Sequence, residues 1–295
     1  MSDDSLIGRT VAGYRLLQHV GEGGTATVYK AEHPDRGLAA MKVLRTRLAQ
    51  DPVAVKRFLR EAEFGTRFNH PNIVKTYDYG QTEDLYYLAM EWVDGESLER
   101  FASRSGRLAP PLVASIIEQV GGALSAAHAL NIIHRDLKPA NIMYNPETQR
   151  AVLLDFGIAR DTDVKPEERL TRTGFFVGTL QYVAPEALSG ELVSAQADVY
   201  SLATIAYYLL AGTLPYTGRS PRELFQQLLT EPPVALNQAV KGLRFPAGVE
   251  EAMTAGLARE LSVRSKTVDE FCASLCTALR QSGERKSFLQ NIFGR

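Results

Sequence analysis

This 295-residue sequence has few cysteines and tryptophans, nearly equal numbers of acidic and basic residues, and no apolar stretch of membrane-spanning length. It contains two cysteines and one tryptophan, and its formal net charge is -1. This charge gives none of the global positive field that nucleic-acid binding exploits, so we expect no nucleic-acid partner. The longest mainly apolar stretch, VYSLATIAYYLLAG at 199–212, is shorter than the roughly 20 residues that span a bilayer. It predicts a buried helix.

The N-terminus and the cysteines both favour a cytoplasmic protein. The opening MSDDSLIGRT is acidic and polar, whereas a secretory signal begins with positive charge and an apolar run. We therefore expect no export signal. Cys272 and Cys276 are four residues apart in an apolar pattern, which places both thiols on one helix face. This spacing favours core packing in a reducing compartment over a metal site or a disulfide.

The periodicity of the chain changes after about 90 residues, from mainly strand-like to mainly helical. Asp51 and Pro52 form a helix-start signal, and apolar residues follow at helical spacing to about Phe68. Gly, Pro and Asp separate the strand-like pieces, as in antiparallel hairpins. We expect strands at 14–20, 27–33, 38–44, 73–79 and 85–93, a hairpin at 142–154, and helices at 111–130, 195–211, 221–230 and 248–279.

The stretch HRDLKPANIM at 134–143 gathers three polar side chains of different chemistry, Asp136, Lys138 and Asn141. Its proline disfavours a helix interior, and apolar residues flank it on both sides. The trio therefore lies on a loop held by a core. Such a loop is either a solvated turn or a rigid support for chemistry.

A glycine-rich stretch, GEGGTATVYK at 21–30, lies between two strand-like pieces. It is either an ordinary hairpin turn or a loop that covers phosphates closely. A Rossmann opening would start a helix at once, whereas the residues that follow are β-rich. The pattern favours a phosphate-covering hairpin over a Rossmann unit.

Further charged residues flank these stretches. Lys42 shares one strand face with Ala40, where a lysine is most often only solvated. Glu61 and Glu63 both border the apolar stripe of the first helix, and periodicity does not choose between them. Asp155 ends an apolar strand, and with Asn141 it offers the oxygen ligands that magnesium prefers.

The ordered set GEGGTATV, AAMK, LREAE, HRDLKPAN, DFG and APE resembles the signature of the eukaryotic-type (Hanks-type) serine/threonine protein kinase family. It is most similar to the bacterial branch, over about residues 14 to 276. The resemblance implies an α+β, two-lobed protein kinase fold with a small β-rich N-lobe, one main helix in it, and a larger α-rich C-lobe. The implied parts are an N-terminal extension at 1–13, the N-lobe at 14–93, the C-lobe at 94–279 and a tail at 280–295.

The resemblance also implies the roles of single residues. Lys42 would hold the α and β phosphates of ATP while pairing with Glu61, and Asp136 would accept the proton of the substrate hydroxyl. Lys138 would neutralise charge on the transferred phosphoryl group, and Asn141 with Asp155 would hold Mg²⁺ or Mn²⁺. The implied nucleotide-binding residues are Gly21, Glu22, Gly23, Gly24, Thr25, Ala26, Val28, Ala40, Lys42, Met90, Glu91, Val93 and Met143.

Two more features bear on stability and helix placement. By resemblance, Glu186 pairs with a buried arginine, Arg264, and Asp198 fastens the backbone of the catalytic loop. Gly65 replaces the apolar residue that stacks toward the DFG phenylalanine in the family. Glycine would leave a gap there and costs about 1 kcal/mol against alanine in a helix. We therefore expect a partner or a homodimer contact to fix this helix.

The function implied is a protein serine/threonine kinase. A catalytically dead scaffold would lack Lys42, Asp136 or Asp155, and all three are present. A small-molecule kinase would lack the segment from Asp155 to Glu186, which resembles a peptide-docking segment. Lys138 and Thr179 match the serine/threonine type over the tyrosine type.

Regulation is expected in the charged segment before Thr179. Phosphate on Thr171 or Thr173 would pair with Arg135 and order the loop, with Thr162 a weaker candidate site. The alternative is that these threonines are only solvated and that Arg135 pairs with Glu167 or Glu168. The tail at 280–295 is either frayed or an amphipathic segment that docks on the kinase, a partner or an anionic membrane.

Overall fold

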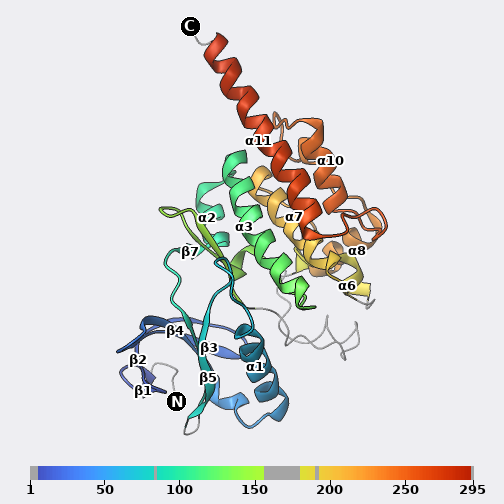
Figure 1. Cartoon of the computed structure of the whole chain (residues 1–295). Helices are drawn as coiled ribbons and strands as arrows, with labels where there is room; N and C mark the ends of the chain where they lie inside the picture. The colour runs from blue at the N-terminus through green and yellow to red at the C-terminus, as the bar shows by residue number, and fades with distance from the viewer. Residues whose placement is uncertain (1–5, 83–84, 156–179, 190–192, 294–295) are drawn as a thin grey trace. The chain divides into compact units, whose positions relative to one another are not determined.

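The computed structural model describes residues 6–82, 85–155, 180–189 and 193–293, with side chains up to 281 (Figure 1). The chain divides into two compact units. The first comprises residues 1–94 and 154–161, and the second comprises residues 95–153 and 162–295. The predicted combination of an antiparallel sheet followed by a helical part is confirmed.

A six-stranded antiparallel sheet forms the first unit, in the order β1-β2-β3-β4-β6-β5. Its two faces differ because side chains alternate along each strand. One face carries a closed core that includes Tyr29, Met41 and Tyr87, and the other carries Val28 and Lys42. The strands are β1 (Thr10–Val11), β2 (Tyr14–Glu22), β3 (Ala26–His33), β4 (Gly37–Leu44), β5 (Thr76–Thr82) and β6 (Leu85–Glu91).

Helix α1 (Pro52–Gly65) follows the short 3-10 helix η2 (Thr46–Leu48) and interrupts the sheet. Its start is as predicted, because Asp51 accepts a hydrogen bond from the backbone N–H of Val53 at 2.9 Å and Pro52 opens the helix. The helix ends earlier than the predicted Phe68. The Thr66 hydroxyl donates to the carbonyl of Glu63 at 2.7 Å and so occupies a terminal helix acceptor.

The second unit contains a small sheet, β7-β8-β9, and most of the helices. The predicted hairpin is present, and its turn is closed by Asn145, whose side-chain oxygen accepts from two backbone N–H groups. The strands are β7 (Glu96–Ser97), β8 (Ile142–Asn145) and β9 (Arg150–Leu153). The helices are α2 (Leu98–Ser105), α3 (Pro110–Ala129), η3 (Pro139–Asn141), α6 (Pro185–Ser189), α7 (Gln196–Ala211), α8 (Pro221–Thr230), α9 (Leu236–Ala239), α10 (Ala247–Gly256) and α11 (Val268–Phe293).

Helix α7 forms the centre of the second unit, and nearly all of its residues are buried. This confirms the expectation of a buried helix at the longest apolar stretch. Within the described ranges, no helix combines the length and the apolar character that crossing a membrane requires.

Helices α3 and α11 pack along each other and hold the two cysteines. An added Cβ at Gly121 would overlap the sulfur of Cys272, so glycine permits this close approach. Both thiols are free, as expected for core packing. Burial raises the pKa of Cys276 to about 12 and that of Cys272 still further, which keeps both protonated at neutral pH.

The prediction of one helix over 248–279 is wrong. Helices α10 and α11 are separate, and residues 257–267 connect them. The new helix starts where Thr267 accepts a hydrogen bond from the N–H of Glu270 at 3.1 Å, while the Glu270 carboxylate accepts from Lys266 N–H at 2.7 Å. A threonine followed three residues later by glutamate is a capping signal for the start of a helix, and it is present in the sequence.

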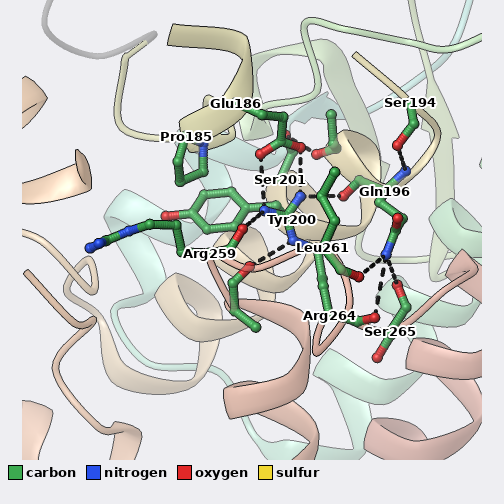
Figure 2. A network of polar contacts seen from close by, with 12 residues as sticks. Pro185, Glu186, Ser194, Gln196, Tyr200, Ser201, Arg259, Leu261, Arg264 and Ser265 are labelled. Carbon is green, nitrogen blue, oxygen red and sulfur yellow. Dashed lines mark hydrogen bonds and ion pairs between the residues drawn. The ribbon is translucent and has the colours of Figure 1, made fainter. Parts of the chain in front are cut away.

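The connection between α10 and α11 carries Arg264, a residue that is 1% exposed. Figure 2 shows its guanidinium facing Glu186 in a two-pronged ion pair, with N–O distances of 2.6 and 3.0 Å. The same side chain donates to the carbonyls of Ala258, Gln196 and Arg259 at 2.7, 2.9 and 3.2 Å. All five N–H donors of the arginine are therefore used. The expected pairing of Glu186 with Arg264 is present.

Replacing Arg264 by methionine should destabilise the second unit by about 3–5 kcal/mol, because it leaves the buried Glu186 carboxylate without its cation. Arg264→Lys should cost less, since it keeps the charge but not the planar fork. Urea unfolding followed by circular dichroism measures both. Arg222→Met, at an exposed position of α8, is the control and should change stability by less than about 0.5 kcal/mol. An Arg264→Met protein as stable as the parent would contradict the assigned role.

Candidate active site

Lys42 on β4 forms ion pairs with two carboxylates in the first unit. Its Nζ lies 2.6 Å from Oε1 of Glu61 on α1 and 2.9 Å from Oδ2 of Asp155, which follows β9 in the chain. Glu63 lies elsewhere and pairs with Arg67 at 2.8 Å. The structure thus brings together Lys42, Glu61 and Asp155, and of the two candidate glutamates it is Glu61 that contacts the lysine.

Burial and charge act in opposite directions on this cluster. Burial alone would lower the pKa of Lys42, but the carboxylates of Asp155 and Glu61 outweigh it, so the pKa is raised and the ammonium persists. Burial raises the pKa of Glu61 above its ordinary value, and Lys42 opposes that rise. The result is a fixed cation held between two carboxylates, a suitable partner for a polyanionic ligand.

The sheet register gathers other predicted residues on the face that carries Lys42. Val28 pairs with Lys42 across β3 and β4, and Ala40 pairs with Met90 across β4 and β6. Because residues two apart share a face, Val28, Ala40, Lys42 and Met90 line one surface. Leu88, opposite Lys42 on β6, belongs to it as well, although the motifs did not point to it.

The glycine-rich stretch forms the turn between β2 and β3. Gly21 and Glu22 end β2, and Ala26 begins β3. The backbone N–H of Gly23 donates to the carbonyl of Ala26 at 2.8 Å, which closes the turn. Strand continues after it, as expected for a phosphate-covering hairpin and against a Rossmann unit. Ala26, in the place of a third glycine, is buried in this strand pair. Thr25 lies in the turn, and Glu91 and Val93 lie at and after the end of β6.

The expectation of a gap at Gly65 is wrong. An added Cβ there would overlap Oγ1 of Thr76, the first residue of β5. The threonine hydroxyl therefore occupies the space next to the glycine. Gly65 and Glu61 are four residues apart and share one face of α1, so the close contact at Gly65 sets how far Glu61 reaches over the sheet. Sequence motifs missed Thr76, because its significance depends on a residue of another element.

The loop at 134–141 in the second unit is fastened by Asp198 of α7, as expected. Its carboxylate accepts hydrogen bonds from the backbone N–H groups of His134 and Arg135 at 2.8 and 3.1 Å. It also contacts Nε2 of His128 on α3 at 2.7 Å, a partner that the motifs did not indicate. Arg135 has a φ of 64°, a left-handed conformation that costs free energy for a non-glycine residue. The two hydrogen bonds offset that cost.

Three predicted residues meet on this loop. Nζ of Lys138 lies 3.3 Å from Oδ2 of Asp136. The Asn141 side-chain amide donates to the Asp136 carbonyl at 2.8 Å and to its carboxylate at 3.3 Å. Because its amide nitrogen is used in this way, Asn141 has its side-chain oxygen left as an acceptor or metal ligand.

The remaining predicted residues are divided between the two units or lie outside the described residues. Asp155 belongs to the first unit, whereas Asn141 and the half-buried Met143 of β8 belong to the second. Joint metal binding by Asn141 and Asp155 stays a prediction. Within the described residues, no group of three or more His, Cys, Asp or Glu side chains could hold a metal ion. Phe156 and the threonines at 162, 171, 173 and 179 lie outside the described residues.

Comparison with known proteins decides the family. The sequence-family model of the protein kinase domain matches residues 14–290 of this chain. The chain belongs to the protein kinase family. It is 37% identical over 279 residues to the serine/threonine-protein kinase pkn3 of Myxococcus xanthus, covering 92% of this chain and 51% of that protein. The resemblance to bacterial Hanks-type kinases is confirmed.

Solved structures of kinases resemble the chain as well. The kinase domain of PknI from Mycobacterium tuberculosis is 31% identical, with a TM-score of 0.69 and coverage of 91% of this chain and 97% of that one. Rad53 residues 1–466, solved in complex with AMP-PNP, is 27% identical, with a TM-score of 0.73 and coverage of 89% and 65%. The chain spans about half the length of the curated relatives it matches.

Gly65→Ala should lower the ratio of kcat to KM for ATP by about ten- to hundredfold, because the added methyl displaces α1 and with it Glu61. Thr76→Ala removes the overlapping hydroxyl, so the double variant Gly65→Ala/Thr76→Ala should recover to within a few-fold of the parent. Thr76→Ala alone is the matched control. Steady-state kinetics with varied ATP measure all four proteins. A double variant as slow as Gly65→Ala would show that this contact does not position the helix.

Proposed function

We propose that the chain is a protein serine/threonine kinase that transfers the γ-phosphate of ATP to serine and threonine hydroxyls of protein substrates. The observation that carries this proposal is the buried Lys42, held by Glu61 at 2.6 Å and by Asp155 at 2.9 Å. A cation fixed in this way is preorganised for phosphates. Membership of the protein kinase family and the names of the bacterial relatives support the assignment.

In this proposal the first unit supplies most of the residues that bind the nucleotide. The turn from Gly21 to Ala26 covers the phosphates, and Lys42 contacts the α and β phosphates. Val28, Ala40 and Met90 lie on the same sheet face as Lys42 and contact the adenine from one side. Glu91 and Val93 offer backbone hydrogen bonds to the purine edge, and Met143 closes the adenine site.

The loop at 134–141 carries the chemistry of transfer. Asp136 accepts the proton of the substrate hydroxyl as that oxygen attacks the γ-phosphorus, and the bond from the γ-phosphorus to the bridging oxygen of ADP breaks. Lys138, 3.3 Å from Asp136, neutralises charge on the transferred group. Asp198 holds the loop backbone, so both side chains are positioned before substrate binds.

Asn141 and Asp155 are the residues that would hold Mg²⁺ or Mn²⁺, because their amide and carboxylate oxygens suit a hard cation. The ion would neutralise charge on the β and γ phosphates. Lys42 already orients the Asp155 carboxylate, and Asp136 orients the Asn141 amide. A location in the cytoplasm and activation through a homodimer are further proposals from the sequence. The tail at 280–295 stays either a frayed end or a segment that docks on the kinase, a partner or an anionic membrane.

Asp136→Asn should keep ATP affinity within about threefold and lower turnover by about 10²–10⁴-fold, because it removes only the proton acceptor. Fluorescent nucleotide displacement measures binding, and transfer of radiolabelled γ-phosphate to a generic protein measures turnover. Asp35→Asn, at an exposed turn, is the control. Turnover within a few-fold of the parent would overturn the assignment. Transfer to small alcohols or antibiotics in preference to protein would favour a small-molecule kinase instead.

We also propose that the kinase is activated by autophosphorylation at Thr171 and Thr173. Arg135, directly before Asp136, forms no ion pair with the residues that the structure describes, and its backbone is fixed by Asp198. A phosphate would supply an anion for Arg135 and a strong, charge-assisted contact. Pairing of Arg135 with Glu167 or Glu168 is the alternative.

The double variant Thr171→Ala/Thr173→Ala should lose most of the activity, and mass spectrometry of the purified parent should find phosphate at these threonines but none in Asp136→Asn. Thr162→Ala, in the same segment, is the matched control and should stay active. Arg135→Gln should slow the phosphorylated protein and leave the activity of the double variant unchanged. A fully active parent without phosphate, or a double variant as fast as the parent, would exclude this switch.

A further inference from the structure

The glycine-rich turn between β2 and β3 is tied to the segment that follows β4. Nη2 of Arg45 lies 2.6 Å from Oε2 of Glu22, the last residue of β2. The backbone N–H of Arg45 donates to the carbonyl of Thr25 at 3.0 Å. The Arg47 guanidinium donates to the carbonyl of Gly24 at 3.3 Å. Two arginines of one short segment therefore hold the turn at three points.

The Glu22 side chain lies on the sheet face opposite Lys42. Glu22 pairs with Thr27 across β2 and β3, so these two side chains share a face. Val28, the next residue along β3, pairs with Lys42 and belongs to the other face. The ion pair between Glu22 and Arg45 is therefore formed away from the surface that carries Lys42.

The Glu22 carboxylate has a second nitrogen-bearing neighbour. Its Oε1 lies 3.7 Å from Nε2 of His19 on β2, while Oε2 contacts Arg45. Among the residues that the structure describes, this Nε2 and Nε of Arg45 are buried and have no hydrogen-bond partner. The Arg45 side chain is 21% exposed, so solvent screens its ion pair less than a fully exposed one. We therefore expect this pair to contribute more than an ordinary surface salt bridge.

We propose that Glu22 is a positioning residue for the nucleotide, and that its ion pair with Arg45 fixes the glycine-rich turn over the phosphates. This inference rests on the proposed function. Glu22 acts through Arg45 and does not touch the nucleotide itself. The resemblance to kinases implied a nucleotide-binding role for Glu22, whereas its side chain reaches the opposite face of the sheet.

Two physical effects make the ion pair favourable for binding. Gly21, Gly23 and Gly24 give the turn a large conformational freedom. A turn that is already held loses less of this freedom when ATP binds, so its affinity for the nucleotide is higher. The pair also neutralises a carboxylate that would otherwise repel the phosphates from a neighbouring position on the turn.

Glu22→Gln should raise KM for ATP about three- to tenfold and leave kcat within about twofold, because the loop that carries Asp136 is unchanged. Dissociation of a fluorescent ADP analogue, followed by stopped flow, should be faster by a similar factor. Hydrogen exchange of the backbone at 22–27 should also be faster in the protein without nucleotide.

Arg45→Gln should have the larger effect on KM, because it leaves the Glu22 carboxylate without its cation. The double variant Glu22→Gln/Arg45→Gln should match Glu22→Gln, since both changes remove the same contact. The matched control is Glu63→Gln, which breaks the 2.8 Å ion pair with Arg67 in the same unit but outside the turn. Its KM, kcat and ADP dissociation rate should equal those of the parent.

An unchanged KM and ADP dissociation rate in Glu22→Gln would overturn the inference, and so would a double variant whose effect is the product of the two single effects. A lower thermal stability with unchanged nucleotide binding would make the pair purely structural and equally overturn it. A parent protein that binds no ADP would refute the proposed function. In that case hydrogen exchange at 22–27 would still decide whether the ion pair holds the turn.

Discussion

Lys42 is only 9% exposed, and a buried ammonium group needs carboxylates to remain charged. The first unit is arranged around that requirement. Lys42 needs Glu61 and Asp155, and the three residues come from separate parts of the chain: a strand, a helix and the segment that follows β9. Glu61 is itself costly to bury without a cation. The cluster therefore holds α1 against the sheet and also draws the segment at Asp155 into the first unit. A group that stabilises the fold in this way is at the same time an electrostatic site for phosphates.

The second unit contains two more buried charged side chains that need polar partners. Asp198, 1% exposed, is satisfied by two backbone N–H groups and by His128, and it fixes the loop that carries Asp136. Arg264 is satisfied by Glu186 and three carbonyls. In both places a buried charge gathers backbone that no regular secondary structure would hold, so irregular segments acquire the rigidity that catalysis requires.

The two sides of helix α1 differ in how closely they are packed. Toward the sheet it approaches so closely that only glycine fits beside Thr76, and one turn earlier it carries Glu61. On the outside it exposes leucine and phenylalanine beside basic side chains. The inner side can hold one geometry only, because an added Cβ at Gly65 would overlap Thr76.

Local signals in the sequence determined much of this protein. Alternation along 14–44 predicted the strands, Asp51 and Pro52 predicted the start of α1, and the ordered motifs identified the family, because each depends on neighbouring residues alone. Asp136, Lys138 and Asn141 could be placed on one loop for the same reason. Only the tertiary structure divided 248–279 into two helices, since the connection is held there by Arg264 and its partner Glu186, 78 residues away. Only the tertiary structure placed Thr76 against Gly65 and joined the tyrosines of β5 and β6 to the outer side of α1. These features arise from contacts between residues distant in the chain, and neither periodicity nor capping records which distant side chains will meet.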